Sequence, residues 1–275
     1  MKLSIDLKTD IDFYDINIWI GENNYSEKLS IPDGSINELL SDRKKNFNIT
    51  GNIITHHISY FYYPRVGNDI LANIIAEEDL SEYEPSGAMV MEQDYFSEPA
   101  GFEKGLESRF MQGFKVLRLF PKTHKYPFEA GGFGKFYKVL DSHRFPVMIS
   151  LDEIDITGNK NIEWERILEI AASFTNIPFI IDGGTSKQLM FNSYLFSLLG
   201  SSENIYFNTH NLLAMDQLED LAGAGGEKRL LFDSNFPYLE THLSVGRITS
   251  SGLSMENKQR IAGLNMKKLF NDIEF

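Results

Sequence analysis

The chain has 275 residues, 42% of them hydrophobic, and no cysteine. This length allows one large hydrophobic core, and the lack of thiols excludes both a disulfide framework and a thiolate metal site. Acidic residues outnumber basic ones by 39 to 26, and the formal net charge of -13 disfavours nucleic acid and anionic lipid as partners.

Short runs rich in aliphatic and β-branched residues recur along the chain and predict eight β-strands. They cover residues 14–20, 52–58, 87–93, 114–120, 146–152, 178–183, 204–210 and 229–235. Most of the runs are almost continuously hydrophobic, which is typical of strands buried on both faces of a parallel sheet.

Helical patterns follow each of these runs. They cover residues 35–47, 67–83, 103–112, 131–143, 163–175, 185–200, 213–225 and 255–270. Eightfold alternation of strand and helix favours a closed (β/α)8 TIM barrel over an open doubly wound sheet. We therefore expect a single domain over residues 1–275, an eight-stranded parallel barrel with the last helix, about 255–271, packed on its outside.

The first predicted strand alternates polar and aliphatic side chains. A period of two places Asp15, Asn17 and Trp19 on one face and three isoleucines on the other, before Gly21 ends the run. The isoleucine face is suited to packing, so the other face is available to line a site.

Polar residues also gather where the other strands end, and in a TIM barrel these ends form the mouth that carries the chemistry. The candidates at the mouth are Asn17, Trp19, His56, His57, Glu92, Gln93, Arg118, His124, Ser150, Asp152, Glu153, Asp182, Asn208, His210, Asp233 and Asn235. Since adjacent strand residues face opposite sides, at least one of His56 and His57 is expected at the surface or against a helix.

The segments YDINIWIG, GFKVLRLFP, FPVMIS, IPFIIDGG and LLFDSNFPYLE resemble the amidohydrolase superfamily of metal-dependent hydrolases, particularly its second large branch of hydrolases and decarboxylases. The resemblance extends from about residue 12 to residue 271. It implies a TIM barrel that hydrolyses a small carboxylated or cyclic substrate.

The resemblance also implies where metal ligands would lie. The family's two first-strand histidines fall on Asn17 and Trp19, its mid-barrel histidine on Ser150, its histidine before glycine on Asp182, and its eighth-strand aspartate on Asn235. None of these positions keeps the family residue. Zinc needs three or four imidazole or carboxylate ligands and an indole offers no lone pair, so no zinc is expected and the site is interpreted as degenerate.

An oxygen-only site for Mg²⁺ or Mn²⁺ stays open as an alternative. It would use Asp152, Asp182 and Asp233, which end three of the predicted strands. The identity of any cofactor is otherwise left unknown by the sequence.

His210 is the best candidate for a general acid or base because imidazole titrates near neutral pH, and Asp182 and Asp152 are the accompanying catalytic candidates. Arg118 is expected to point inward, either in an ion pair with Glu92, Asp152 or Asp182, or as a clamp for a substrate carboxylate. The other predicted substrate-binding residues are Asn17, Trp19, Asn208 and Asn235.

Two classes of function follow from these residues. The first is an amidohydrolase-like hydrolase with a metal-free or rebuilt site. The second is a catalytically inactive barrel that binds a small anionic ligand or a partner protein. A small-molecule ligand, most simply an anion, is the expected partner, and homo-oligomers stay possible. No run approaches the length of a membrane span and the N-terminus lacks an apolar signal core, so a cytoplasmic location is expected.

Overall fold

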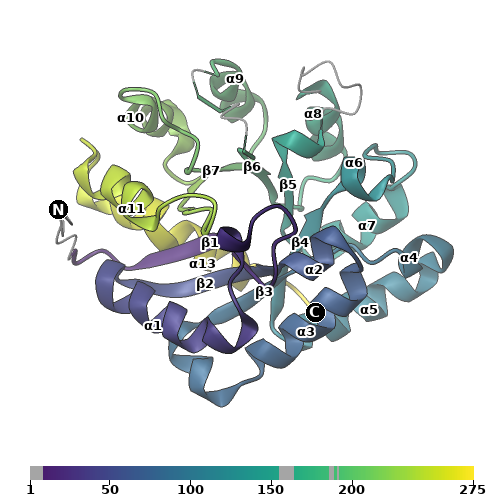
Figure 1. The fold of residues 1–275 in the computed structure, drawn as a ribbon. Helices are drawn as coiled ribbons and strands as arrows, with labels where there is room; N and C mark the ends of the chain where they lie inside the picture. Colours follow the sequence, from purple (N-terminus) through teal and green to yellow (C-terminus); the bar gives the residue numbers. More distant parts are fainter. Residues whose placement is uncertain (1–8, 155–163, 186–188, 191) are drawn as a thin grey trace.

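The computed structural model describes residues 9–154, 164–185, 189–190 and 192–275 (Figure 1). Eight parallel strands pair in chain order. They are β1 Phe13–Ile20, β2 Ile49–His56, β3 Pro85–Val90, β4 Phe114–Leu119, β5 Val147–Ser150, β6 Phe179–Asp182, β7 Ile205–Asn208 and β8 Leu230–Leu231. The chain just after β8 returns to β1 through backbone hydrogen bonds from Ile16 to Phe232 (3.3 Å) and from Trp19 to Phe236 (2.9 Å). The predicted eight-stranded barrel is therefore confirmed.

Helices surround the strands, as the sequence pattern predicted. The longer ones are α1 Ile36–Phe47, α3 Pro64–Ile75, α5 Phe102–Met111, α7 Gly134–Ser142, α8 Trp164–Ser173, α9 Tyr194–Ser201, α11 Thr241–Ser250 and α13 Asn265–Asn271. The shorter ones are α2 His57–Phe61, α4 Asp94–Ser97, α6 Pro121–His124, α10 Gln217–Leu221 and α12 Met255–Gln259. No helix in the described part of the chain has the length and apolar character needed to cross a membrane.

Two helix predictions have clearly different bounds in the structure, and one helix, α11, was not predicted. The helix expected over 67–83 ends at Ile75, and a separate 3-10 segment, Glu78–Tyr83, follows it. The helix expected over 185–200 begins only at Tyr194, and residues 186–188 and 191 of that prediction lie outside the described residues. The sequence pattern missed α11 because serine, threonine and glycine, all weak helix formers, make up half of it.

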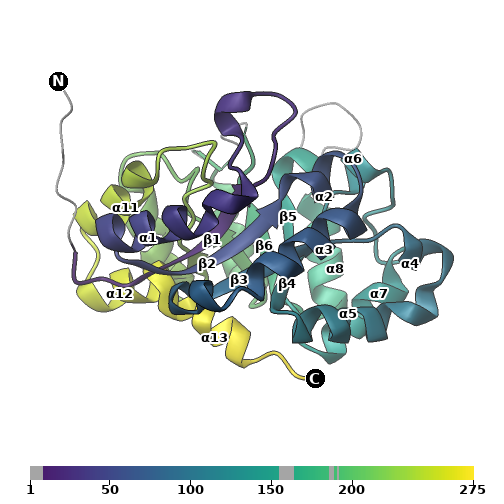
Figure 2. The same cartoon turned by 60° about the horizontal axis from the view of Figure 1, so that its bottom comes forward.

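The lower half of the barrel interior is a hydrophobic cluster. Its strand residues are Tyr14, Ile16, Ile53, Ala88, Val116, Met148, Ile180 and Leu231. Met266 and Leu269 of α13 pack into the same cluster, and Figure 2 shows α13 below the strands, opposite the β1–α1 loop. The last helix therefore closes the amino-terminal end of the barrel, and the prediction that it packs on the outside was wrong. The reason is that the open end of the barrel presents apolar surface that α13 buries.

The first strand does not keep a period of two. Its pairing with β2 shifts register between Asp15 and Ile18. As a result Ile16 joins the interior cluster, while Asp15 turns to Arg43 of α1 in the helical layer. The prediction that Asp15, Asn17 and Trp19 share one face was wrong for Asp15, because the irregularity rotates the chain between the two polar positions.

Candidate functional site

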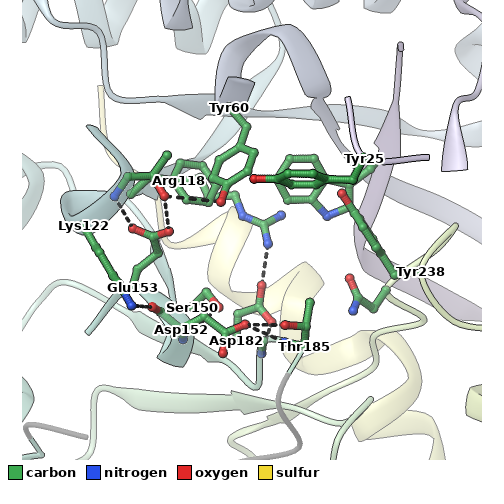
Figure 3. Close-up of a pocket in the computed structure, with 15 residues that line it drawn as sticks. Tyr25, Tyr60, Arg118, Lys122, Ser150, Asp152, Glu153, Asp182, Thr185 and Tyr238 are labelled. Atoms are coloured by element: carbon green, nitrogen blue, oxygen red, sulfur yellow. Dashed lines mark hydrogen bonds and ion pairs between the residues drawn. The ribbon is translucent and has the colours of Figure 1, made fainter. Parts of the chain in front are cut away.

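A cavity of about 450 Å³ opens at the carboxyl ends of the strands (Figure 3). Its lining includes five aromatic side chains, Trp19, Tyr25, Tyr60, Phe120 and Tyr238. The remaining lining residues are Arg118, Lys122, Thr123, Ser150, Asp152, Glu153, Asp182, Gly184, Thr185 and Asn235. Figure 3 shows the three tyrosines apart from Ser150, Asp152 and Thr185, so the cavity has an aromatic wall and a polar wall. Its volume is in the range of small-molecule sites.

Arg118, from β4, forms a buried ion pair with Asp182 at the end of β6. The same guanidinium donates to Asn17 Oδ1 (2.7 Å) and Thr55 Oγ1 (3.1 Å). Its Cζ atom lies 4.3 Å from the centre of the Trp19 ring, a cation–π contact. Burial alone would raise the pKa of Asp182, but Arg118 and then His210 lower it below the ordinary value. Of the two roles predicted for Arg118, the ion pair with Asp182 is therefore the one observed.

Amide side chains connect the two sides of this core. Asn17 turns its oxygen to Arg118, and its Nδ2 lies 3.2 Å from Asp233 Oδ2 and 3.4 Å from Asp182 Oδ2. Asn208, at the end of β7, donates to the same two aspartates. Asn17 and Asn208 are at most 1% exposed and do not line the cavity, whereas Asn235 does.

His210 lies just after β7 and is fully buried. Its Nδ1 is 2.7 Å from Asp233 Oδ2, and its Nε2 is 2.9 Å from the carbonyl oxygen of Gly184. Burial disfavours the charged ring, but Asp233 and then Asp182 favour it and raise the pKa of His210 to about 9. Both nitrogens therefore carry protons at neutral pH and donate them to these two acceptors. His210 does not line the cavity, so its predicted catalytic role stays a prediction.

Sequence reasoning missed Arg43. This α1 residue is 3% exposed and pairs with Asp15, and it also donates to Thr241 Oγ1 (3.0 Å). A signal was present in the sequence, because Ile36, Leu40 and Arg43 follow the i, i+4, i+7 spacing of one buried helix face.

The aromatic wall is supported from behind by His57. Its ring stacks on Trp19 with centroids 5.3 Å apart. Burial lowers the pKa of His57 to about 4, so the ring is neutral: Nδ1 donates to the Gly21 carbonyl oxygen and Nε2 accepts from the Tyr238 hydroxyl. The Tyr238 oxygen in turn accepts from Asn23 Nδ2 (2.9 Å). This chain of hydrogen bonds holds the β1–α1 loop over the mouth.

The two adjacent histidines can both be buried because the chain changes direction between them: His56 ends β2 and His57 begins α2. His56 lies 3.0 Å from Asp33, and both histidines are buried. Glu92, another predicted mouth residue, pairs with Arg109 (2.6 Å) and not with Arg118.

The polar wall is held by residues that follow β5. Asp152 Oδ2 accepts from the backbone nitrogen (2.7 Å) and hydroxyl (2.9 Å) of Thr185. Glu153 Oε1 accepts from the Thr123 hydroxyl (2.6 Å). Among the described residues, the Lys122 ammonium donates to the Asp152 carbonyl oxygen at 3.4 Å and forms no ion pair. It is an exposed cation at the edge of the cavity.

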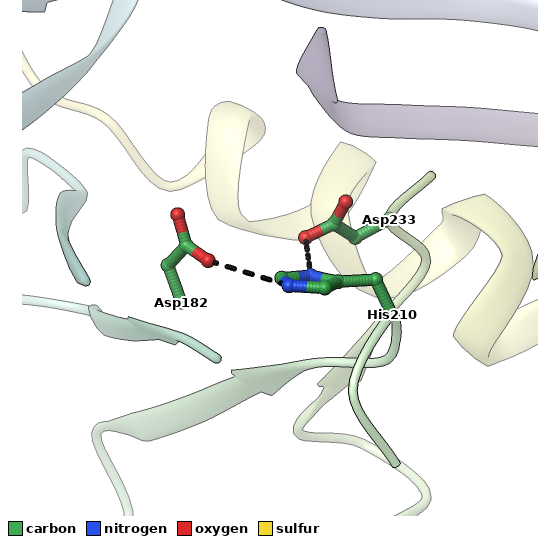
Figure 4. Close-up of side chains that lie close together, drawn as sticks. All are labelled: Asp182, His210 and Asp233. Carbon is green, nitrogen blue, oxygen red and sulfur yellow. Dashed lines mark hydrogen bonds and ion pairs between the residues drawn. The ribbon is translucent and has the colours of Figure 1, made fainter. Parts of the chain in front are cut away.

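One group of described residues has the composition of a metal site. Asp182, His210 and Asp233 offer side-chain atoms within 4.8 Å of one another (Figure 4). The group does not fit a divalent metal, because both ring nitrogens of His210 already contact acceptors, Asp233 and the Gly184 carbonyl oxygen, and the Arg118 cation already binds Asp182. The alternative of Asp152, Asp182 and Asp233 was wrong, since Asp152 is not part of this group and binds Thr185 instead.

The positions that the resemblance assigned to metal ligands are equally unsuited. Ser150 caps the turn that follows β5 by accepting from the Asp152 nitrogen. Trp19 fills its place with an indole, and Asn17 and Asn235 supply neutral amides. These donors lack the charge that holds a divalent ion in a protein site.

No family model matches the chain, and no curated protein matches it. Solved structures do. An amidohydrolase II has a TM-score of 0.68 at 15% identity, covering 94% of this chain and 100% of its own. 2,6-Dihydroxybenzoate decarboxylase from Rhizobium has a TM-score of 0.67 at 11% identity, covering 95% of this chain and 99% of its own.

A third similar structure is 5-carboxyvanillate decarboxylase from Novosphingobium aromaticivorans, solved with manganese and 4-hydroxy-3-methoxy-5-nitrobenzoic acid. It has a TM-score of 0.71 at 12% identity, covering 97% of this chain and 99% of its own. At such identities the likeness establishes the fold alone, a TIM barrel, as the sequence predicted.

Proposed function

We propose that this amidohydrolase-type barrel binds a small aromatic carboxylate at its mouth by a mechanism that uses no metal ion. The observation that carries the proposal is the division of the cavity into an aromatic wall and a polar wall. A planar ring can pack against Trp19, Tyr60 and Phe120, while polar substituents reach Ser150 and Thr185 on the other side.

The anionic part of the proposal rests on Lys122 and not on Arg118. Asp182 already neutralises Arg118, so the guanidinium is not available as a carboxylate clamp. The Lys122 ammonium at the cavity edge has no carboxylate partner among the described residues and can meet one from a ligand.

The similar solved structures support this ligand class. Two of them are decarboxylases named for carboxylated aromatic compounds, and one was solved with a substituted benzoic acid. Shared fold alone does not transfer a reaction, so the proposal is limited to the chemical class of the ligand.

Tryptophan fluorescence offers a direct test because the chain contains only 2 tryptophans. Trp164→Phe leaves Trp19, in the cavity wall, as the sole indole. Titration of this variant with benzoate is expected to change the emission saturably. Cyclohexanecarboxylate, with the same charge but no aromatic face, should bind roughly threefold to tenfold more weakly. Equal binding of the two acids, or no binding of benzoate, would contradict the proposal.

The contribution of the ligand's negative charge can be tested separately by comparing benzoate with benzyl alcohol, a neutral aromatic compound. Lys122→Met should weaken benzoate binding and leave the binding of benzyl alcohol unchanged, as measured by calorimetry. Lys138→Met, on α7 and away from the cavity, is the matched control and should change neither affinity. If Lys122→Met and Lys138→Met behave alike, the ligand's charge is not recognised by Lys122.

The hydrolase predicted from the sequence, with His210, Asp182 and Asp152 as catalytic residues, is tested with the same compounds. Asp182 and Asp152 line the cavity and His210 lies behind it. Incubation of the wild type with benzamide and methyl benzoate, followed by NMR, reports any hydrolysis. Turnover abolished by Asp152→Asn would support the catalytic prediction over simple binding.

A further inference from the structure

The environment of Arg118 resembles the coordination of a bound cation. Side-chain oxygens from three different strands converge on its guanidinium: Asn17 Oδ1 from β1, Thr55 Oγ1 from β2 and Asp182 Oδ2 from β6. The Trp19 ring adds a cation–π contact at 4.3 Å. The side chain is 2% exposed, so this charge is held inside the barrel and not at its surface.

The charges around it balance. Three aspartates in and around the barrel are at most 3% exposed: Asp15, Asp182 and Asp233. Each pairs with one buried cation, respectively Arg43, Arg118 and the protonated His210. Because each buried acid has its own partner, no unbalanced negative charge remains in this group to attract a metal ion.

We propose that the centre of this barrel is a cation site filled by the chain's own guanidinium. The site suits a guanidinium: oxygens meet both of its terminal nitrogens, and an aromatic ring faces its carbon, while Nε has no hydrogen-bond partner among the described residues. Removal of the Arg118 side chain should therefore leave a site that takes up free guanidinium from solution. This inference does not depend on the identity of the ligand at the mouth.

Chemical rescue tests the inference. Arg118→Ala is expected to lower Tm strongly. Guanidinium chloride or methylguanidinium, titrated well below denaturing concentrations, should raise that Tm saturably, whereas sodium chloride at equal ionic strength should not. The wild type should show only a monotonic decrease with guanidinium.

A control with a different cavity distinguishes a specific site from general stabilisation. Leu269→Ala also removes a large buried side chain, but from an apolar cluster, and guanidinium should not rescue it. Equal rescue of both variants, or no rescue of Arg118→Ala, would overturn the inference. Rescue of Arg118→Ala by Mn²⁺ or Zn²⁺ in place of guanidinium would also overturn it, since the site would then be a metal site.

A second pair of variants covers the case in which Arg118→Ala does not fold. Arg118→Met leaves Asp182 buried without its cation, and Arg118→Met with Asp182→Asn removes both charges. If the oxygens serve to bind a cation, the double variant should be more stable than Arg118→Met. A double variant that is no more stable than Arg118→Met would contradict the role assigned to Asp182.

Discussion

Arg43 shows how a residue that does not line the cavity fixes the strand that does. Its guanidinium holds Asp15, and Asp15 Oδ1 accepts from the backbone nitrogens of Ser234 (3.0 Å) and Asn17 (3.2 Å). One carboxylate thus ties β1 to the segment after β8, where the barrel closes. The ion pair positions Asn17 for its contact with Arg118.

We expect Arg43→Met to destabilise the protein by about 3–5 kcal/mol, because the substitution leaves Asp15 buried without a cation. Denaturant unfolding measures the change. Lys44→Met is the matched control: the neighbouring Lys44 pairs with Glu82 at the surface, and its loss should change stability by less than about 1 kcal/mol. Similar values for the two variants would show that the Arg43 pair is not structural.

His210 predicts a pH dependence of stability at the alkaline side. Its pKa is about 9 in the folded protein, against roughly 6.5 when unfolded. A raised pKa contributes stability that is fully present below pH 6.5 and is lost as the pH rises through 9. The decrease could reach about 3 kcal/mol. Unfolding free energies measured between pH 6 and 10 check this, and His210→Asn should flatten that part of the profile. A wild-type profile that is flat over this range would contradict the charged state assigned to His210.

Among the helices, α13 has a distinct role, because it closes the amino-terminal end of the barrel. Leu269 is 4% exposed in the cluster that fills the lower barrel, whereas Leu264, in the π-helical turn before α13, is 55% exposed. Leu269→Ala should therefore cost about 2–5 kcal/mol. Leu264→Ala should change stability by less than about 0.5 kcal/mol. Thermal or denaturant unfolding of both variants measures these losses of stability. Similar losses for the two variants would contradict the role of α13 in closing the barrel.

The strands could be predicted from sequence because each is a run of apolar residues that needs no distant partner to be recognised. The position of α13 could not, since Met266 and Leu269 would look the same on a helix that packs outside the barrel. The register shift in β1 could not be predicted either, because it depends on the pairing of β1 with β2 and on the ion pair between Arg43 and Asp15.

The candidate site, too, could be predicted from the sequence only in part. Trp19, Arg118, Asp152, Asp182 and Asn235 were predicted at the mouth and do line the cavity. The partner of Arg118 was predicted as Glu92, Asp152 or Asp182, and the choice of Asp182 could not be made from sequence because it depends on contacts across the barrel. The tyrosines of the aromatic wall come from three separate segments, which only the fold brings together.

Because each of the three buried aspartates pairs with a cation of the chain itself, the stability of the whole protein is expected not to depend on divalent metals. Dialysis against EDTA should leave the Tm unchanged, and added Mn²⁺ or Zn²⁺ should not raise it, because the central donors are neutral or already bound to cations. Elemental analysis of protein purified without added metal should show no stoichiometric metal. A stoichiometric ion whose removal lowers the Tm would refute this expectation.

The mutual pairing of the buried charges also restricts the mutational routes open to this barrel. A histidine introduced at position 19 would lie beside the Arg118 guanidinium, which repels any incoming metal ion. Loss of Arg118 as the first step leaves Asp182 buried without its partner. Whichever of these two substitutions comes first, the single variant is expected to bind metal weakly and to be less stable than the wild type. Metal binding is therefore expected to arise in this scaffold only when position 118 and the surrounding positions change together, so stepwise selection for it should fail where a designed multiple replacement succeeds.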